Sequence, residues 1–238
     1  MDALVIVPTY NERDNLPPLL QGVLAHAGTR VLVVDDQSPD GTGDVADALG
    51  REWAGRVEVI HRTGRRGLGR SLLAGLSRAA AGTTELVIQM DADLSHGPQY
   101  LPQLAAAAAE ADLVVGSRYL DGVSVVNWPL RRLILSAFAN HYVRTVTRLP
   151  VHDCTSGFRC WRRDALARLP LDRVASEGYA FLVEMLYIAH RHGCRIVESP
   201  IIFVERRQGA SKLSSNAILE SALMPWRLLF GGHGLPSK

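Results

Sequence analysis

Residues 86–96 read LVIQMDADLSH, a short and largely apolar run that leads directly into two aspartates, Asp91 and Asp93. A bounded apolar run of this length is typical of a buried strand, and the polar residues after it mark where the strand ends. Comparable runs occur at residues 4–7, 31–34, 57–60 and 113–115, and helical patterns at 16–26, 43–53, 67–81 and 98–109 lie between them. This alternation predicts an α/β, Rossmann-like fold with a mostly parallel sheet flanked by helices.

After about residue 121 the alternation stops. Four later segments have a high apolar content and are interpreted as helices or strands: an arginine-bounded stretch at 131–148, a helix at 177–192, a strand at 194–204 and a helix at 214–230. Pro225 interrupts the last of these patterns. We predict one domain over residues 1–213, followed by a C-terminal amphipathic helix and tail over 214–238.

The composition argues against several classes of protein. The chain has 238 residues, 47 % of them hydrophobic, and its formal net charge of +2 is too small to indicate nucleic-acid binding. Its cysteines, Cys154, Cys160 and Cys194, have no CxxC spacing, so a reducing cytoplasm is expected rather than a disulfide framework or a zinc site. The N-terminus lacks signal-peptide features, and no run approaches the roughly 18 apolar residues of a membrane span.

The pair Asp91 and Asp93 is the central candidate for chemistry. Carboxylates at positions i and i+2, on a turn that leaves a strand, can converge on one hard cation such as Mg²⁺ or Mn²⁺. Such a cation would keep open positions for the oxygens of a substrate phosphate. The alternative interpretation is that both aspartates are solvated turn residues.

Two other strand ends carry polar or aromatic residues where ligands bind in sheets of this type. Tyr10 and Glu12 follow the first strand, where Tyr10 could stack on a base and Glu12 could accept a hydrogen bond from a base or ribose. Asp35 and Asp36 follow the second strand, where a carboxylate could accept hydrogen bonds from a ribose or a base edge. The alternative is that these segments are ordinary turns and helix caps.

Two basic segments are candidates for phosphate contact. Residues 64–69, GRRGLG, have neither the glycine spacing of a dinucleotide loop nor the Lys-Ser/Thr of a P-loop, so they are interpreted as a flexible, basic connection to the third helix. Arg206 and Lys212 flank Gly209 in a polar loop, which could close over a diphosphate. A solvated basic loop is the alternative for this second segment.

Taken in order, the motifs resemble those of dolichol-phosphate mannose synthases and their bacterial polyprenol monophosphomannose relatives, which are inverting GT-A glycosyltransferases. The matching blocks run over roughly residues 4–213: PTYNE at 8–12, VDD at 34–36 with SPDGT at 38–42, DADLSH at 91–96, GSRY at 116–119, NWP at 127–129, TSGFR at 155–159, EGY at 177–179 and the segment 206–212.

The resemblance implies a GT-A nucleotide-sugar-binding fold and transfer of mannose from GDP-mannose to a polyprenyl, dolichyl-type phosphate with inversion. The products would be a polyprenyl β-D-mannosyl phosphate and GDP. One alternative is a polyprenyl-phosphate glucosyltransferase that uses UDP-glucose. Another is a binding module without catalytic activity, against which the complete set of Asp91, Asp93 and Arg118 argues.

The resemblance also implies a role for individual residues. Guanosine would be held by Pro8, Tyr10, Glu12, Val34 and Asp36. The divalent metal, Mg²⁺ or Mn²⁺, would be held by Asp91 and Asp93, with Ala92 against the nucleotide sugar. The phosphates of donor and acceptor would face Arg118, Arg206 and Lys212. Ser95 stands where some relatives have a glutamine as a third metal ligand, and a water could take that position instead.

A lipid acceptor implies a membrane surface as partner. The expected localisation is cytoplasmic, peripheral on the cytoplasmic face of the membrane. Residues 133–146 and 218–230 combine arginines with large apolar side chains, which suits helices that lie in the membrane interface. The alternatives are that these helices pack on the sheet, or that a membrane-anchoring partner protein covers the C-terminal one.

Overall fold

The computed structural model describes residues 1–205 and 215–230. The strands are β1 Ala3–Thr9, β2 Thr29–Asp35, β3 Val57–His61, β4 Leu86–Gln89, β5 Leu113–Ser117, β6 Val125–Val126, β7 Arg159–Arg162, β8 Ile196–Pro200 and β9 Phe203–Val204. The α-helices are α1 Leu16–Leu24, α2 Thr42–Glu52, α3 Leu68–Ala80, α4 Leu101–Ala107, α5 Leu130–Thr147, α6 Arg163–Ala167, α7 Gly178–Arg191 and α8 Ser215–Phe230, and two 3₁₀ turns, η1 and η2, lie at Pro98–Tyr100 and Leu171–Arg173.

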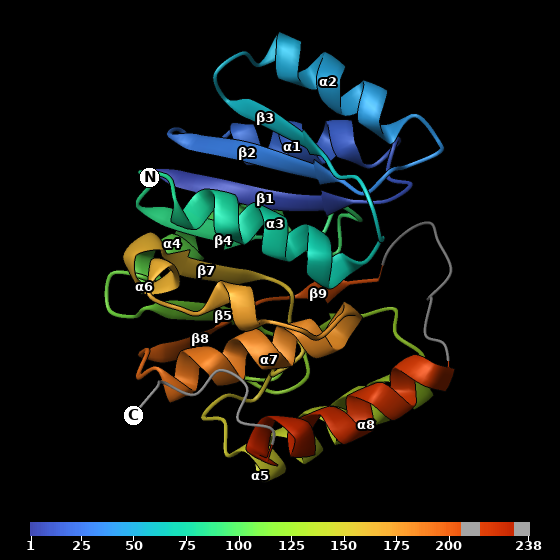
Figure 1. The fold of residues 1–238 in the computed structure, drawn as a ribbon, viewed down its shortest axis with the longest axis vertical. Coiled ribbons are helices and arrows are strands. Elements are labelled where there is room, and N and C mark those ends of the chain that lie inside the picture. The colour runs from blue at the N-terminus through green and yellow to red at the C-terminus, as the bar shows by residue number, and fades with distance from the viewer. Residues whose placement is uncertain (206–214, 231–238) are drawn as a thin grey trace.

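The main sheet has the order β3-β2-β1-β4-β7-β5-β8 (Figure 1). All neighbouring strands are parallel except β7, which runs antiparallel to both β4 and β5. The five strands expected from the apolar runs are all present. Strand β7 was not predicted, because its sequence RCWR carries an arginine at each end and has no apolar run. Arg159 nevertheless lies fully buried, since it donates to the carbonyls of Ser156, Leu182 and Cys154.

Helices cover both faces of this sheet and bury one apolar cluster on each (Figure 1). On one face α3 and α7 pack against side chains such as Ile6 and Val115, and α1 and α4 pack on the other face against side chains such as Val5 and Val114. Helix α3 lies especially close to β1. A Cβ at Gly75 would be 2.5 Å from Cγ2 of Ile6, so only glycine fits at this crossing.

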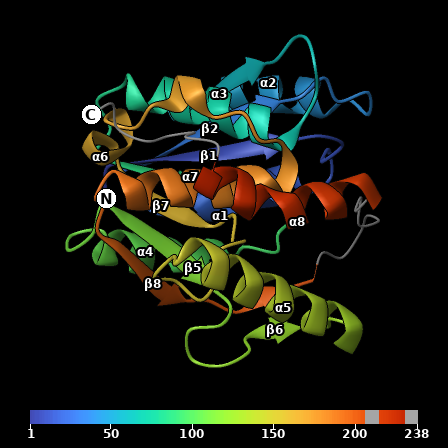
Figure 2. The same ribbon diagram turned by 60° about the horizontal axis from the view of Figure 1, so that its bottom comes forward.

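The predicted late strand at 194–204 is divided in two. Strand β8 lies at the edge of the main sheet, whereas β9 pairs with β6 in a separate two-stranded sheet. Helix α8 packs against both α7 and α5, and it lies in front of α7 in Figure 2. No helix in the described ranges is long and apolar enough to cross a membrane.

The sheet order creates a place for a ligand. Strands β2 and β3 follow on one side of β1, whereas β4 and the later strands lie on its other side. In open α/β sheets, ligands bind beyond the carboxyl ends of the strands at such a change of direction. The pairing of β1 with β4 ends at Ile6 and Gln89, while β1 continues to Thr9 beside β2. The loops after β1, β2 and β4 therefore surround this position.

Candidate functional site

Each of these three loops contains a non-glycine residue in the left-handed backbone region. The residues are Asn11 after β1, Gln37 after β2 and Leu94 after β4, with φ angles of 61°, 61° and 62°. Conformations of this kind are costly, and they cluster at functional sites because the surrounding structure must enforce them. Three of them in loops at one edge of the sheet indicate that the loops are shaped for a ligand.

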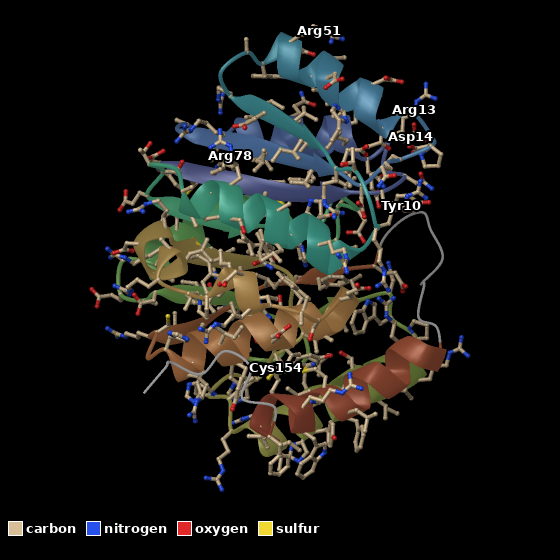
Figure 3. The ribbon with its side chains drawn as sticks, viewed as in Figure 1. Tyr10, Arg13, Asp14, Arg51, Arg78 and Cys154 are labelled. Carbon is tan, nitrogen blue, oxygen red and sulfur yellow. The ribbon has the colours of Figure 1, made fainter. Side chains whose placement is uncertain are left out.

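The loop after β1 carries Tyr10 and Glu12 to the carboxyl-end edge of the sheet, where Figure 3 shows Tyr10 beside Arg13 and Asp14. The backbone of this loop is tied to the loop after β2. Asn11 N–H donates to the hydroxyl of Ser38 at 3.1 Å, and Glu12 N–H donates to that of Thr42 at 2.9 Å. These bonds fix Tyr10 and Glu12 relative to the end of β2.

Asp36 is almost fully buried and holds the basic connection before α3 in place. Its carboxylate accepts a hydrogen bond from Gly67 N–H at 2.7 Å and forms an ion pair with Arg62. The side chain of Gln37 also donates to the carbonyl of Gly64 at 2.7 Å. The segment predicted to be a flexible connection is therefore anchored at both ends. Each carboxylate oxygen has two lone pairs, so Asp36 retains acceptor capacity for a ribose or base.

Within that segment, sequence reasoning missed Arg66. Its guanidinium lies over the ring of Tyr10, with Cζ 5.0 Å from the ring centroid, and Nη1 donates to the Tyr10 hydroxyl at 3.0 Å. Nη2 donates to the carbonyl of Gln37 at 2.9 Å. The clustered arginines were the only available signal, because the sequence does not indicate which of them reaches the aromatic ring.

The turn after β4 is held by its own side chains. Ser95 donates twice to Oδ1 of Asp93, from its hydroxyl at 2.5 Å and from its backbone N–H at 3.1 Å. The backbone N–H of Asp91 donates to Nδ1 of His96 at 3.1 Å, and the His96 ring stacks on Phe158. His96 therefore closes the turn that presents the two aspartates.

These residues fit a divalent cation. The side chains are hard oxygen donors, and Gly157 leaves space in front of Asp91, since a Cβ there would lie 3.4 Å and 3.6 Å from the two carboxylate oxygens. Among the described residues, no group of three or more histidines, cysteines, aspartates and glutamates is placed to hold a metal. Mg²⁺ in many phosphate sites is held by one or two carboxylates together with substrate phosphate and water, a coordination that Asp91 and Asp93 suit.

Arg118 follows β5 and is buried, with only 8 % of its surface exposed to solvent. Its Nε and Nη2 donate to the two carboxylate oxygens of Asp153, both at 2.7 Å, and Nη2 also donates to Thr155 at 2.8 Å. Burial alone would raise the pKa of Asp153, but the charge and hydrogen bonds of Arg118 outweigh it and hold that pKa below its ordinary value. Sequence reasoning identified Arg118 and missed Asp153, which lies in a segment without secondary structure.

An aromatic cluster joins Arg118 to the aspartate turn. Phe203 lies 5.5 Å from the Arg118 guanidinium and 5.6 Å from the His96 ring. Trp128 contacts Phe203 edge to face, and Arg132 stacks on Trp128 at 4.2 Å while it pairs with Glu205. Trp128 belongs to the NWP motif singled out in the sequence. Arg132 and Glu205 were missed, since neither belongs to a motif.

The remaining predicted site residues are placed as follows. Pro8 and Val34 are buried partners across β1 and β2, and Ala92 is buried between the two aspartates. Arg206 and Lys212 lie outside the described residues. The structure therefore brings the residues predicted for the base, Tyr10, Glu12 and Asp36, to the same edge of the sheet as the predicted metal ligands.

Cys154, Cys160 and Cys194 are free thiols in the structure. Burial raises the pKa of Cys154 and of Cys160 to about 12. Thiols that remain protonated at neutral pH are poor nucleophiles and poor metal ligands, so none of the chemistry of the site is assigned to them.

One family model and two known proteins each match most of this chain in sequence. The model described as glycosyl transferase family 2 matches residues 4–169. Polyprenol monophosphomannose synthase from Mycolicibacterium smegmatis is 47 % identical over 221 residues, which cover 92 % of this chain and 83 % of that protein. Undecaprenyl-phosphate mannosyltransferase from Micrococcus luteus is 43 % identical over 242 residues, covering 100 % of this chain and 99 % of that protein.

Solved structures share the fold at lower identity. Glucosyl-3-phosphoglycerate synthase from Mycobacterium tuberculosis, in complex with Mn²⁺, uridine diphosphate and glucosyl-3-phosphoglycerate, matches with a TM-score of 0.68 and 18 % identity, covering 99 % of this chain and 81 % of that one. The same enzyme with Mn²⁺ and UDP-glucose matches with a TM-score of 0.63 and 17 % identity, covering 99 % and 80 %. The predicted GT-A fold, with its mostly parallel sheet, is thereby confirmed.

Proposed function

We propose, from the premise that this chain belongs to glycosyl transferase family 2, that it transfers mannose from GDP-mannose to a polyprenyl phosphate. The observation that carries this proposal is the match, over nearly the whole chain, to two relatives whose names specify mannose and a polyprenyl phosphate. The aspartate turn at the carboxyl end of β4 supports it independently, because that is where a sheet of this order binds a ligand.

The donor half of the reaction is assigned to the loops after β1, β2 and β4. Tyr10, Glu12 and Asp36, with Pro8 and Val34 behind them, form the proposed guanosine site. Asp91 and Asp93 would hold Mg²⁺ or Mn²⁺, which when bound neutralises the charge of the leaving diphosphate. Ser95 orients Asp93 through two hydrogen bonds, so we assign it as a support of that ligand rather than as a ligand itself.

The acceptor half needs little acid–base chemistry. A phosphate monoester has a second pKa of about 6 and is largely dianionic at neutral pH, so its oxygen is already nucleophilic. The enzyme must instead offset the repulsion between two anions. Arg118, Arg206 and Lys212 are proposed for this task, with Arg118 held in place by Asp153. Direct attack on an α-linked donor inverts the anomeric carbon and gives a β-mannosyl phosphate.

A lipid acceptor requires the site to reach a membrane surface, and helices α5 and α8 provide a suitable face. Exposed apolar side chains project from both: Leu130, Ile134, Leu135 and Phe138 from α5, and Leu223, Trp226, Leu229 and Phe230 from α8. Trp226 donates to the hydroxyl of Tyr142 at 2.8 Å, which joins the two helices. We propose that residues 215–230 complete this apolar face and that the face lies on the cytoplasmic leaflet of the membrane. The alternative is that a membrane-anchoring partner protein covers the face.

In the decisive experiment, purified protein is incubated with a polyprenyl phosphate and either GDP-mannose or UDP-glucose. Each reaction is run with Mn²⁺, after Mn²⁺ has been removed, and after Mn²⁺ has been added back. The proposal expects consumption of GDP-mannose alone, dependence on the returned metal, and a β-linked product by the NMR coupling of the anomeric proton. Consumption of UDP-glucose alone would replace the proposal with the glucosyltransferase alternative. An α-linked product would reject inversion.

A further inference from the structure

We infer that Arg66 reads the guanine base of the donor, and that it does so by donating two hydrogen bonds to the base edge that carries O6 and N7. This inference rests on the proposed GDP-mannose donor and names a residue that selects it. None of the motifs in the sequence marks Arg66. Its assignment comes from where the segment before α3 lies in the structure.

The segment is fixed at both ends, and this aims Arg66. Asp36 binds Arg62 and Gly67 N–H on either side of the tip, and Gln37 holds the carbonyl of Gly64. The two arginines at the tip then diverge. Arg65 pairs with Glu177 at 3.4 Å, whereas Arg66 lies over Tyr10 at the carboxyl-end edge of the sheet. Figure 3 shows Tyr10 at this edge of the sheet and Arg78, in the last turn of α3, at the opposite edge.

The hydrogen-bond inventory of Arg66 leaves donors for a ligand. A guanidinium carries five N–H groups. In the part of the chain that the structure describes, one from Nη1 binds the Tyr10 hydroxyl and one from Nη2 binds the carbonyl of Gln37. The side chain is exposed, so a base that approaches Tyr10 meets the remaining donors without displacing protein from the core.

Arg66 supplies the donor fork, which lies over the Tyr10 ring. Glu12, two residues after Tyr10 in the same loop, carries the carboxylate proposed for the donors of the base, and its Oε2 accepts a hydrogen bond from Asn15 at 2.7 Å. Guanine matches both, because it presents acceptors at O6 and N7 and donors at N1 and N2. Adenine places an amino group where guanine has O6, so the fork meets a donor. Uracil has no N7 and offers a single acceptor in that direction.

The test measures equilibrium binding of GDP, 7-deaza-GDP and UDP, with saturating Mn²⁺, to the wild type and to Arg66→Ala, Arg66→Lys and Arg65→Ala. 7-Deaza-GDP lacks only the N7 acceptor. We expect the wild type to bind GDP more tightly than 7-deaza-GDP. A bidentate contact of this kind is worth roughly 10- to 100-fold in affinity. Arg66→Ala should lose about that factor for GDP, keep its affinity for UDP and no longer distinguish GDP from 7-deaza-GDP.

The other variants separate the fork from its charge. Arg66→Lys should behave like Arg66→Ala, because an ammonium keeps the charge but lacks the planar pair of donors. Arg65→Ala removes the same charge from the same loop tip and should bind all three nucleotides as the wild type does. Thermal unfolding of each variant checks the fold, and little change is expected from exposed side chains.

Three outcomes would overturn the inference. The first is an equal loss of GDP and UDP affinity in Arg66→Ala, which would indicate a charge effect on the diphosphate. The second is an unchanged GDP affinity in Arg66→Ala. The third is a preference for GDP over 7-deaza-GDP that persists in Arg66→Ala. Failure of the proposed function would appear differently. A wild type that binds UDP more tightly than GDP rejects the guanosine donor itself, before any variant is compared.

Discussion

The carboxylate of Asp153 accepts hydrogen bonds from both Nε and Nη2 of Arg118, each at 2.7 Å, at a position where Asp153 is 0 % exposed. A buried ion pair of this kind adds little to stability as a unit, but loss of one partner leaves the other charge uncompensated. Asp153 therefore fixes a buried cation beside the candidate active site. Its own charge does not have to contact the substrate to do so.

The first prediction concerns this pair. Asp153→Asn should lower the free energy of unfolding by about 3–5 kcal/mol, because Arg118 stays buried without its counter-ion. The double change Arg118→Met with Asp153→Leu should cost less than Asp153→Asn alone. Urea unfolding at pH 7 measures both. A single variant within about 1 kcal/mol of the wild type would contradict the argument.

The pair also has a pH signature. The pKa of Asp153 in the folded protein lies below its unfolded value of 3.8. The stability that the pair contributes is therefore complete above pH 3.8 and is lost as the pH falls through the lower, folded value. The difference in unfolding free energy between wild type and the Arg118→Met, Asp153→Leu variant should accordingly be constant from pH 5 to pH 8.

The second prediction separates a metal ligand from its support. Asp93→Ala should abolish both Mn²⁺ binding and transfer, whereas Ser95→Ala should weaken Mn²⁺ binding by less than about tenfold. The difference is expected because the backbone N–H of Ser95 still orients Asp93 after the hydroxyl is removed. Mn²⁺ binding followed by electron paramagnetic resonance, in the presence of GDP, is the measurement. Equal, complete loss in both variants would make Ser95 a ligand.

The third prediction concerns the face of α5 and α8. Phe138 is 66 % exposed and Leu130 is 70 % exposed. Changing both to serine should reduce binding to anionic vesicles by about tenfold or more, since each large apolar side chain gains roughly 1.5–3 kcal/mol when it is buried. Activity on a long-chain acceptor should fall with it, while activity on a short, soluble prenyl phosphate should not.

Ala137→Ser is the matched control, because it makes the same polar change at an exposed but small residue of the same helix. Surface substitutions are a cleaner test than removal of α8. Met224 and Leu228 of that helix are buried in the core cluster on the α7 side, so truncation would also disturb the fold. Equal losses on both acceptors, with vesicle binding intact, would assign this face a structural role.

The fourth prediction concerns the thiols. Native protein treated with iodoacetamide at pH 8 should leave Cys154 and Cys160 unmodified, because burial raises the pKa of each to about 12 from an ordinary value of 9.0. Unfolded protein should label at all three cysteines. The stability linked to these protons is complete below pH 9 and is lost as the pH rises toward 12. Mass spectrometry of the digested protein locates the label.

The sequence predicted those parts of the fold in which apolar residues recur at a helical spacing or form a short run bounded by polar residues. Strands β1 to β5 and the polar loops at their ends were predicted, because a buried parallel strand needs a continuous apolar segment and a ligand site needs exposed polar groups after it. Strand β7 escaped because its sequence has no apolar run and Arg159 is charged. Arg159 is buried because it donates to the carbonyls of Ser156 and Cys154, which are close in sequence, and of Leu182, which is 23 positions away.

The same distinction holds in the site. Residues within motifs, such as Asp91 and Arg118, could be named from spacing and resemblance. Residues that act through contacts between distant segments could not. Asp153 meets Arg118 across 35 positions, and Arg66 meets Tyr10 across 56. An arginine cluster in sequence does not reveal which member reaches the aromatic ring, because that depends on how Asp36 anchors the loop.

The antiparallel insertion of β7 between β4 and β5 also affects how the protein can be made. On the ribosome, β4 and β5 emerge well before Arg159–Arg162 and cannot form the native sheet with each other, since their shared neighbour has not been synthesised. Nascent chains of intermediate length therefore present two unpaired strand edges, which are templates for association with other chains. Expression fragments that stop after β5 should be insoluble, whereas chains that extend past β7 can close the sheet.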